Sequence, residues 1–260
     1  MRYYLAALFH NGHHFLADNA ELLTRERPYF LDSFYYYETD KNTRRNFAAY
    51  YTDLQDRFML DSGAFSFINQ DRAVVPDIDA FTDRYIDFVR ALNPSYFFEM
   101  DVDLVYGVDK ALQLRRRIED ETGRRPIPVW HAPRGAAAFI RDCRDYDYVA
   151  IGSPLMRDHN RKTIISLFPW FVSTAHKHGA RIHALGLSML DVLLKSRFDS
   201  CDSTAWVKQG AYGKVARFNG RGISLIGSTE YRTERTAVVP HNLREYIKLQ
   251  KYLETVNARL

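Results

Sequence analysis

Cysteines are rare in this sequence, and long apolar runs are missing. Its two cysteines, Cys143 and Cys201, are too few for a disulfide framework or a cysteine-rich zinc site, and they suit a reducing compartment. No run approaches the roughly 18 apolar residues of a membrane span. The first ten residues lack a signal-peptide cleavage pattern and predict a strand. We therefore expect a cytoplasmic protein that does not associate with membranes.

No G-x-G-x-x-G turn follows any apolar segment, so a dinucleotide-binding, open doubly wound sheet is only the alternative fold. Short apolar segments alternate with segments of helical periodicity, which favours a parallel sheet. Eight such units in roughly 250 residues predict one α/β domain over 1–260, a (β/α)8 TIM barrel. The expected strands are 2–8, 29–36, 57–60, 96–100, 127–130, 148–151, 181–185 and 198–201, and the expected helices are 77–92, 108–121, 135–144, 161–177, 188–196 and a C-terminal packing helix over 243–256.

Carboxylates follow three of the expected strands. Asp61 follows the third, Asp101 and Asp103 follow the fourth, and Asp202 follows the eighth. The C-terminal ends of barrel strands face one mouth, so these side chains should converge there. Ionised carboxylates that lie close together repel one another. Clusters of this kind persist where a pKa must be raised or a cationic transition state stabilised. For Asp61 alone, an Asx-type turn is the alternative.

Two groups of residues at the same mouth are candidate metal-binding sites. Asp101 and Asp103 are oxygen ligands that suit Mg²⁺, but a metal site is the less favoured interpretation of this pair. Three histidines after the first strand, His10, His13 and His14, could hold Zn²⁺, but loop histidines are more often solvated. We expect no metal and no cofactor.

Two further groups have structural explanations. The run Arg115-Arg116-Arg117 lies within an expected helix and is interpreted as a solvated face. Met156 and Met189 follow the sixth and seventh strands and could wall an aromatic ligand, although core packing is the default.

Positive charge concentrates after the eighth strand. The chain has a net charge of +4, and the segment 206–235 has six Lys and Arg against two Glu, which is also +4. Glycines alternate with these bases, which predicts a flexible loop along phosphates; a solvated basic loop is the alternative. Trp206, Tyr212 and Phe218 could stack on bases. The predicted nucleic-acid contacts are Lys208, Lys214, Arg217 and Arg221.

Several strand-end segments resemble the tRNA-guanine transglycosylase superfamily. The segment 61–65, Asp-Ser-Gly-Ala-Phe, is similar to the family's Asp-Ser-Gly-Gly-Phe motif. The segment 149–152 is similar to its base-binding segment, and 183–187 to its glycine segment after the seventh strand. The segment 198–206 takes the place of its nucleophile strand. The resemblance covers most of the chain, and it is close only in 61–65.

The resemblance implies base exchange, in which an aspartate displaces guanine from C1′ and a 7-deazaguanine then attacks the covalent intermediate. It implies that Asp202 is the nucleophile, with Asp199 the alternative, and that Asp61 is the general acid and base. The same chemistry fits the residues, because retention at C1′ needs one carboxylate to attack and another group to move a proton. The implied base-binding residues are Ser62, Phe65, Asp101, Gly152 and Gly186.

The sequence departs from the tRNA enzymes in two respects. It is much shorter, and it lacks their Cys-x-Cys-x-x-Cys…His zinc site. It thereby looks more like the compact phage and bacterial branch that inserts 7-deazaguanines into DNA. The expected partners are DNA and a 7-deazaguanine base such as preQ0 or preQ1, in the host cytoplasm if the chain is phage-encoded. The alternatives are exchange on tRNA, a non-catalytic nucleic-acid-binding homologue, and a nucleoside or glycoside hydrolase.

Overall fold

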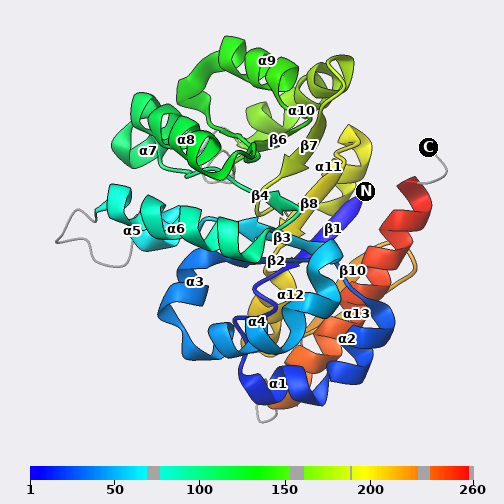
Figure 1. Ribbon diagram of the computed structural model, residues 1–260. Coiled ribbons are helices and arrows are strands. Elements are labelled where there is room, and N and C mark those ends of the chain that lie inside the picture. Colours follow the sequence, from blue (N-terminus) through cyan, green and yellow to red (C-terminus); the bar gives the residue numbers. More distant parts are fainter. Residues whose placement is uncertain (69–76, 153–160, 188, 228–234, 258–260) are drawn as a thin grey trace.

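A curled sheet of eight parallel strands organises the chain (Figure 1). The computed structural model describes residues 1–68, 77–152, 161–187, 189–227 and 235–257. The strand order is β4-β3-β2-β1-β8-β7-β6-β5, so the first strand pairs with the last. The strands are β1 (Arg2–Ala6), β2 (Phe30–Ser33), β3 (Phe58–Asp61), β4 (Tyr96–Phe97), β5 (Val129–Trp130), β6 (Tyr148–Ile151), β7 (Arg181–Ala184) and β8 (Ser200–Ser203).

The two edges of this sheet, β4 and β5, come together without a regular ladder. One parallel bridge joins Phe98 to Ile127, with Ile127 N donating to Phe97 O at 2.7 Å. The next amide, Val129 N, donates to the side chain of Glu99 at 2.5 Å. We call this junction the seam. The sheet is thus a half-barrel consistent with a TIM-like barrel, and the pairing of β1 with β8 is not that of a doubly wound sheet.

Helices surround the sheet and follow most of the expected ranges. Proline is tolerated inside two of them, at Pro169 and Pro240. The last helix begins well before the expected position 243. The long helices are α4 (Lys41–Leu54), α6 (Ile78–Leu92), α8 (Val108–Thr122), α9 (Gly135–Asp145), α10 (Arg161–Lys177) and α13 (Arg235–Asn257); the shorter ones include α1 (His13–Asp18), α2 (Ala20–Glu26), α3 (Phe34–Thr39), α5 (Ala64–Ile68), α7 (Asp103–Tyr106), α11 (Leu190–Ser196) and α12 (Ala205–Ala211).

The aromatic run after β2 is helical rather than extended, contrary to the prediction of a strand over 29–36. β2 ends at Ser33, and Phe34 opens α3. The ring of Phe34 is buried against Phe81 and Phe88 of α6, with ring centroids 5.3 and 5.1 Å apart. Packing against a neighbouring helix therefore decides a segment whose aromatic composition favours a strand.

Alternate strand residues build two separate cores. Tyr4, Met59, Phe98 and Tyr148 face the inside of the curled sheet, while their strand neighbours pack against the outer helices. Among the described residues, no helix is both long enough and apolar enough to cross a lipid bilayer. The short helices α3, α5 and α7, which follow β2, β3 and β4, lie on one side of the molecule, and both termini lie on the opposite side (Figure 1).

Candidate active site

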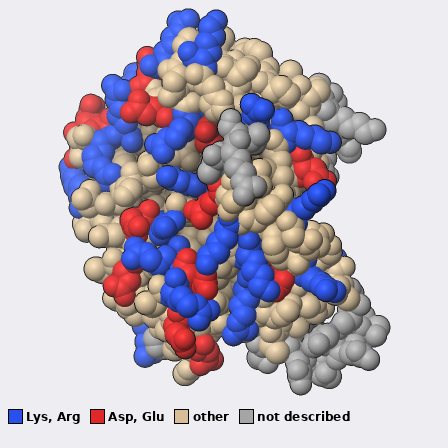
Figure 2. Space-filling view, turned by 90° about the vertical axis from the view of Figure 1, so that its right-hand side faces the viewer, with Lys and Arg blue, Asp and Glu red and all other residues tan. Residues whose placement is uncertain are grey.

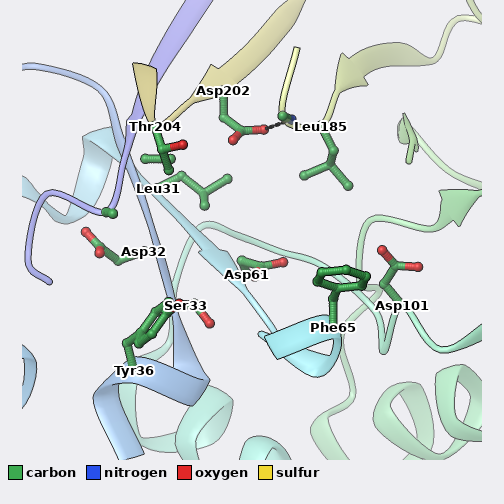
Figure 3. A pocket seen from close by; sticks show the side chains of 13 residues that line it. Leu31, Asp32, Ser33, Tyr36, Asp61, Phe65, Asp101, Leu185, Asp202 and Thr204 are labelled. Atoms are coloured by element: carbon green, nitrogen blue, oxygen red, sulfur yellow. Dashed lines mark hydrogen bonds between the residues drawn. The ribbon is translucent and has the colours of Figure 1, made fainter. Parts of the chain in front are cut away.

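A cavity of about 220 Å³ opens where the strands end. Its volume is below the about 300–1,000 Å³ of drug-sized sites, so it suits a small ligand. Figure 3 shows Asp61 in the middle of the cavity, with Asp202 above it and Phe65 and Asp101 to one side. Three of the four predicted carboxylates, Asp61, Asp101 and Asp202, therefore lie together, and Asp103 does not line the cavity. The remaining lining residues are Ala6, Ala7, Leu31, Asp32, Ser33, Tyr36, Leu185, Gly186 and Thr204.

Asp202 lies within β8, one residue before its end, rather than after an expected strand over 198–201. Its Oδ1 accepts the backbone N–H of Gly186 at 2.7 Å and lies 3.2 Å from His183 Nε2. The other oxygen turns toward the cavity (Figure 3). Oδ1 of the carboxylate is therefore held by hydrogen bonds, and Oδ2 is available to a ligand.

Asp199, the alternative nucleophile, lies at the other end of the same strand. Its Oδ2 accepts Ile182 N at 2.8 Å and faces His176 Nε2 at 2.9 Å. It does not line the cavity. The geometry therefore separates Asp199 from Asp61 and Asp101.

Asp61 ends β3, and its Oδ2 accepts the backbone N–H of Gly63 at 3.0 Å. Burial, together with the charges of Asp101 and Asp202, raises the pKa of Asp61 to about 7. Gly63 is required here because its φ is +73° and a Cβ would lie 2.1 Å from Ser33 Oγ. The turn thereby places a carboxyl group that titrates near neutral pH against the cavity.

Asp101 is paired with a histidine. His131, which follows β5, is buried, and its Nε2 makes a short contact with Asp101 Oδ1. Burial opposes the charge on His131, but the hydrogen bond and the charge of Asp101 raise its pKa above the usual value. The sequence does not predict this pair. Asp101 is partly exposed and lines the cavity.

The other predicted base-binding residues divide into two sets. Phe65 and Gly186 line the cavity, and Phe65 is 47% exposed, as a stacking platform requires. Ser62 and Gly152 do not line it. Ser62 is buried, and a Cβ on Gly152 would lie 2.0 Å from His131 Cε1. Gly152 therefore makes room for the histidine that holds Asp101.

Asp103 begins α7 and does not line the cavity with Asp101. Arg134 donates to both of its carboxylate oxygens, at 2.5 and 2.6 Å. No cluster of three or more potential metal ligands occurs among the described residues. His10 packs on the ring of Tyr36, with centroids 4.0 Å apart. The histidine trio is therefore not assembled around His10.

The prediction of a solvated face over 115–117 is wrong for Arg115. Its side chain is buried and donates to Glu99 at 2.6 Å and to Asp142 at 2.8 Å. Arg134 also donates to Glu99, at 2.8 Å. These four residues and Asp103 form a buried ion network at the seam. The network fixes the loops after β4 and β5, which carry Asp101 and His131.

Sequence reasoning missed Asp32, which lies near the end of β2 beside the cavity. It is buried, accepts Phe9 N at 2.9 Å, and burial raises its pKa to about 8. The signal was present, because Leu31-Asp32 is a fourth apolar strand that reaches an aspartate. The overlong strand prediction over 29–36 concealed it. Of the two methionines, Met189 packs against the core, and Met156 lies outside the described residues.

Residues 206–227, the described part of the basic segment after β8, are folded, contrary to the prediction of a flexible loop. It forms α12 and a hairpin of β9 (Lys214–Phe218) and β10 (Ile223–Gly227). Ala216 N and Phe218 N donate to Asn242 and Glu245 of α13, both at 2.7 Å. Lys208, Lys214, Arg217 and Arg221 are all exposed.

Of the three aromatic residues proposed to stack on bases, only Tyr212 is strongly exposed, at 81%. Trp206 is fully buried and donates to Ala6 O at 2.9 Å, so the stacking prediction is wrong for it. Phe218 is half-buried and packs near Tyr252, with ring centroids 5.8 Å apart. The hairpin itself packs along α13, on the side that carries the termini (Figure 1). On that side, Lys and Arg are spread over the upper and lower parts of the face and are intermixed with Asp and Glu (Figure 2).

A second basic group, which the sequence did not single out, borders the mouth. Asp40 caps α4 and lies 3.7 Å from His10 in the loop after β1. The ring of His10 packs on Tyr36, a cavity residue, so the first turns of α4 begin close to the mouth. Three exposed bases occupy these turns: Lys41, Arg44 and Arg45.

Fold and site together define an α/β half-barrel with a carboxylate cavity at its strand ends. The sequence matches no protein-family model, and no curated protein matches it significantly. Any assignment of activity therefore depends on the chemistry of the cavity.

Proposed function

We propose that the protein is a transglycosylase that replaces guanine in DNA with a 7-deazaguanine. The observation that carries the proposal is the pairing of two unlike carboxyl groups at one cavity. Asp202 presents a free edge, and Asp61 has a pKa of about 7. A nucleophile beside a proton-transfer group is what substitution with retention at C1′ requires.

The first step breaks the C1′–N9 bond of the target guanosine. Asp202 Oδ2 forms a bond to C1′, the electron pair of the broken bond goes to guanine, and Asp61 supplies its proton. In the second step N9 of the 7-deazaguanine attacks C1′, and the C1′–Oδ2 pair returns to Asp202. The proton from N9 returns to Asp61, so both carboxyl groups end the cycle as they began it.

The charge on Asp202 affects the pKa of Asp61 in the direction that the reaction needs. The charge of Asp202 is one of the causes that raise the pKa of Asp61. When Asp202 becomes an ester its charge disappears, so the pKa of Asp61 falls and Asp61 stays ionised. It is then ready to accept the proton of the incoming base.

The base would occupy the side of the cavity that carries Asp101 and Phe65. Asp101 would accept hydrogen bonds from the N–H edge of a guanine-like ring, and Phe65 would stack on its face. Such stacking contributes about 1–3 kcal/mol per base. The sugar would lie toward Ser33 and Tyr36, which Figure 3 shows on the opposite side of Asp61.

The decisive experiment follows release of labelled guanine from DNA and from tRNA, with and without an added 7-deazaguanine. Release from DNA only with the added base is the expected result. Release from tRNA alone would move the substrate to tRNA and keep the mechanism. Release without the added base would indicate a hydrolase, and tight binding with no release would favour a non-catalytic binding protein.

The pH dependence of exchange should follow Asp61. Its pKa of about 7 means that the acid form is lost above neutral pH, so kcat/KM for the nucleic acid should fall there. Asp61→Asn should remove this alkaline limb and slow exchange by about 10²–10⁴-fold. Label release measured between about pH 5 and 9 checks both effects. A limb that persists in Asp61→Asn would assign the acid to another group.

Nucleic-acid binding should depend on salt through the exposed bases. We expect joint replacement of Lys41, Arg44 and Arg45 by alanine to weaken DNA binding regardless of sequence. The plot of log K against log salt should become shallower by about 0.9 for each phosphate that the variant no longer neutralises. The matched variant, Arg217→Ala with Arg221→Ala, tests the hairpin in the same assay. Flattening by the hairpin variant alone would show that the α4 bases lie outside the interface.

A further inference from the structure

A buried chain of hydrogen bonds runs beneath Asp202 inside the curled sheet. His183 Nε2 lies 3.2 Å from Asp202 Oδ1, and His183 Nδ1 lies 2.5 Å from Ser200 Oγ. Ser200 Oγ in turn makes a short contact with the hydroxyl of Tyr148. His183 and Ser200 are fully buried, and Tyr148 and Asp202 are each 6% exposed.

The chemistry of these groups fixes the direction of each hydrogen bond. An ionised Asp202 only accepts, so His183 Nε2 carries a proton, and we assign the ring as the Nε2–H tautomer of a neutral imidazole. Nδ1 is then an acceptor, and the Ser200 hydroxyl donates to it. Ser200 Oγ accepts in turn from Tyr148, whose pKa burial raises well above its usual value, so that its hydroxyl keeps the proton. One consistent arrangement satisfies all four groups.

Packing holds the imidazole of His183 in this orientation. The rings of Phe98 and Tyr4 lie 5.4 and 6.0 Å from it, centroid to centroid. The neighbouring amide of Gly186 donates to the same oxygen, Asp202 Oδ1. Two donors therefore converge on Oδ1, and within the described part of the chain no hydrogen bond to Oδ2 is formed.

We propose that His183 is a positioning residue that selects Oδ2 of Asp202 as the attacking atom, with Ser200 and Tyr148 setting its tautomer. This inference rests on the proposed function. When Oδ2 binds C1′, Oδ1 becomes the carbonyl oxygen of the ester. When the C1′–Oδ2 bond breaks, the electron pair returns to the carboxylate, and the N–H groups of His183 and Gly186 stabilise the returning charge. The same two donors thus serve both steps.

The tautomer can be tested without any activity. In protein with ¹⁵N-labelled histidine, the His183 signals are assigned by their loss in His183→Gln. We expect a proton on Nε2, a bare Nδ1, and a changed Nδ1 shift in Ser200→Ala, where the donor to Nδ1 is gone. A proton on Nδ1, or protons on both nitrogens at neutral pH, would overturn the arrangement. This result holds whether or not the protein exchanges bases.

The kinetic role is tested by comparing His183→Gln with His183→Leu. The glutamine amide keeps an N–H donor toward Asp202, whereas leucine fills the space without one. A hydrogen bond to a charged group contributes about 1.5–3 kcal/mol, so leucine should slow formation and breakdown of the adduct about 10- to 100-fold. KM for the incoming base should be unchanged, and glutamine should recover most of the rate.

The outcomes separate the two proposals. Equal losses in both His183 variants, or none in Ser200→Ala, with thermal unfolding like wild type, would reduce His183 to a packing residue. A wild-type protein that releases no guanine would contradict the proposed function. The NMR measurement would still show whether His183 has the proposed tautomer.

Discussion

Asparagine in place of Asp202 should abolish guanine exchange. The amide keeps the shape and the hydrogen bond from Gly186 N, but it has no anionic oxygen to attack C1′. Loss of a covalent nucleophile costs on the order of 10⁴-fold or more. Label release and trapping of a protein–nucleic acid adduct on a denaturing gel are the two measurements.

The matched control is Asp199→Asn at the other end of β8. Its amide oxygen can still accept Ile182 N, and its position outside the cavity predicts exchange and adduct formation like wild type. An adduct that persists in Asp202→Asn and disappears in Asp199→Asn would move the nucleophile to Asp199. Loss in both variants would point to a defect in the strand and not in the chemistry.

Replacing Arg115 by methionine should have the largest effect on stability. The change leaves Glu99 and Asp142 buried without one of their cations. Removing one partner of a buried ion pair costs about 3–5 kcal/mol. Unfolding in urea, followed by circular dichroism, measures this loss. Methionine keeps much of the apolar volume of the arginine stem, so the loss reports mainly on the charge.

The control for this change is its neighbour on α8. Arg116 is exposed, and Arg116→Met should alter the unfolding free energy by no more than about 0.5 kcal/mol. Equal effects of the two substitutions would show that the buried network does not stabilise the fold. A stable Arg115→Met protein whose KM for the incoming base has risen would instead assign the network to positioning Asp101.

Most of the sheet could be predicted because parallel strands buried on both faces form short apolar runs. The errors occur where tertiary contacts outweigh composition, as in the aromatic run that opens α3. Arg115 is a different case. On α8 it lies in register with the buried residues Ala111, Leu114 and Ile118, so helical periodicity could have revealed its burial.

The candidate site could be predicted only in part. The strand-end rule, which depends on topology alone, places Asp61, Asp101 and Asp202 at one cavity. It is wrong for Asp103, which pairs with Arg134 instead. The rule does not find the partners of the carboxylates in the cavity. His131 is separated by 30 residues from Asp101, and His183 by 19 from Asp202, and no local pattern connects them. These contacts arise from the curvature of the sheet.

The basic segment shows the limit of composition as a guide. Alternating glycines and bases indicated flexibility, but two backbone amides of β9 are bonded to side chains of α13. Those side chains, Asn242 and Glu245, lie more than twenty residues later. A local sequence pattern cannot reveal hydrogen-bond partners so far along the chain, but the hairpin is bonded to them.

The seam divides the sheet into two halves, β1–β4 and β5–β8. Within each half every strand pairs with its neighbour in sequence. Each half needs only short loop closures, which are the fastest to form. The halves are united by the β1–β8 ladder, by the ion network at Glu99, and by Gln250 of α13, whose amide donates to Tyr3 O and Tyr29 O. The cavity needs Asp61 from one half and Asp202 from the other, so it is complete only once the two halves are joined.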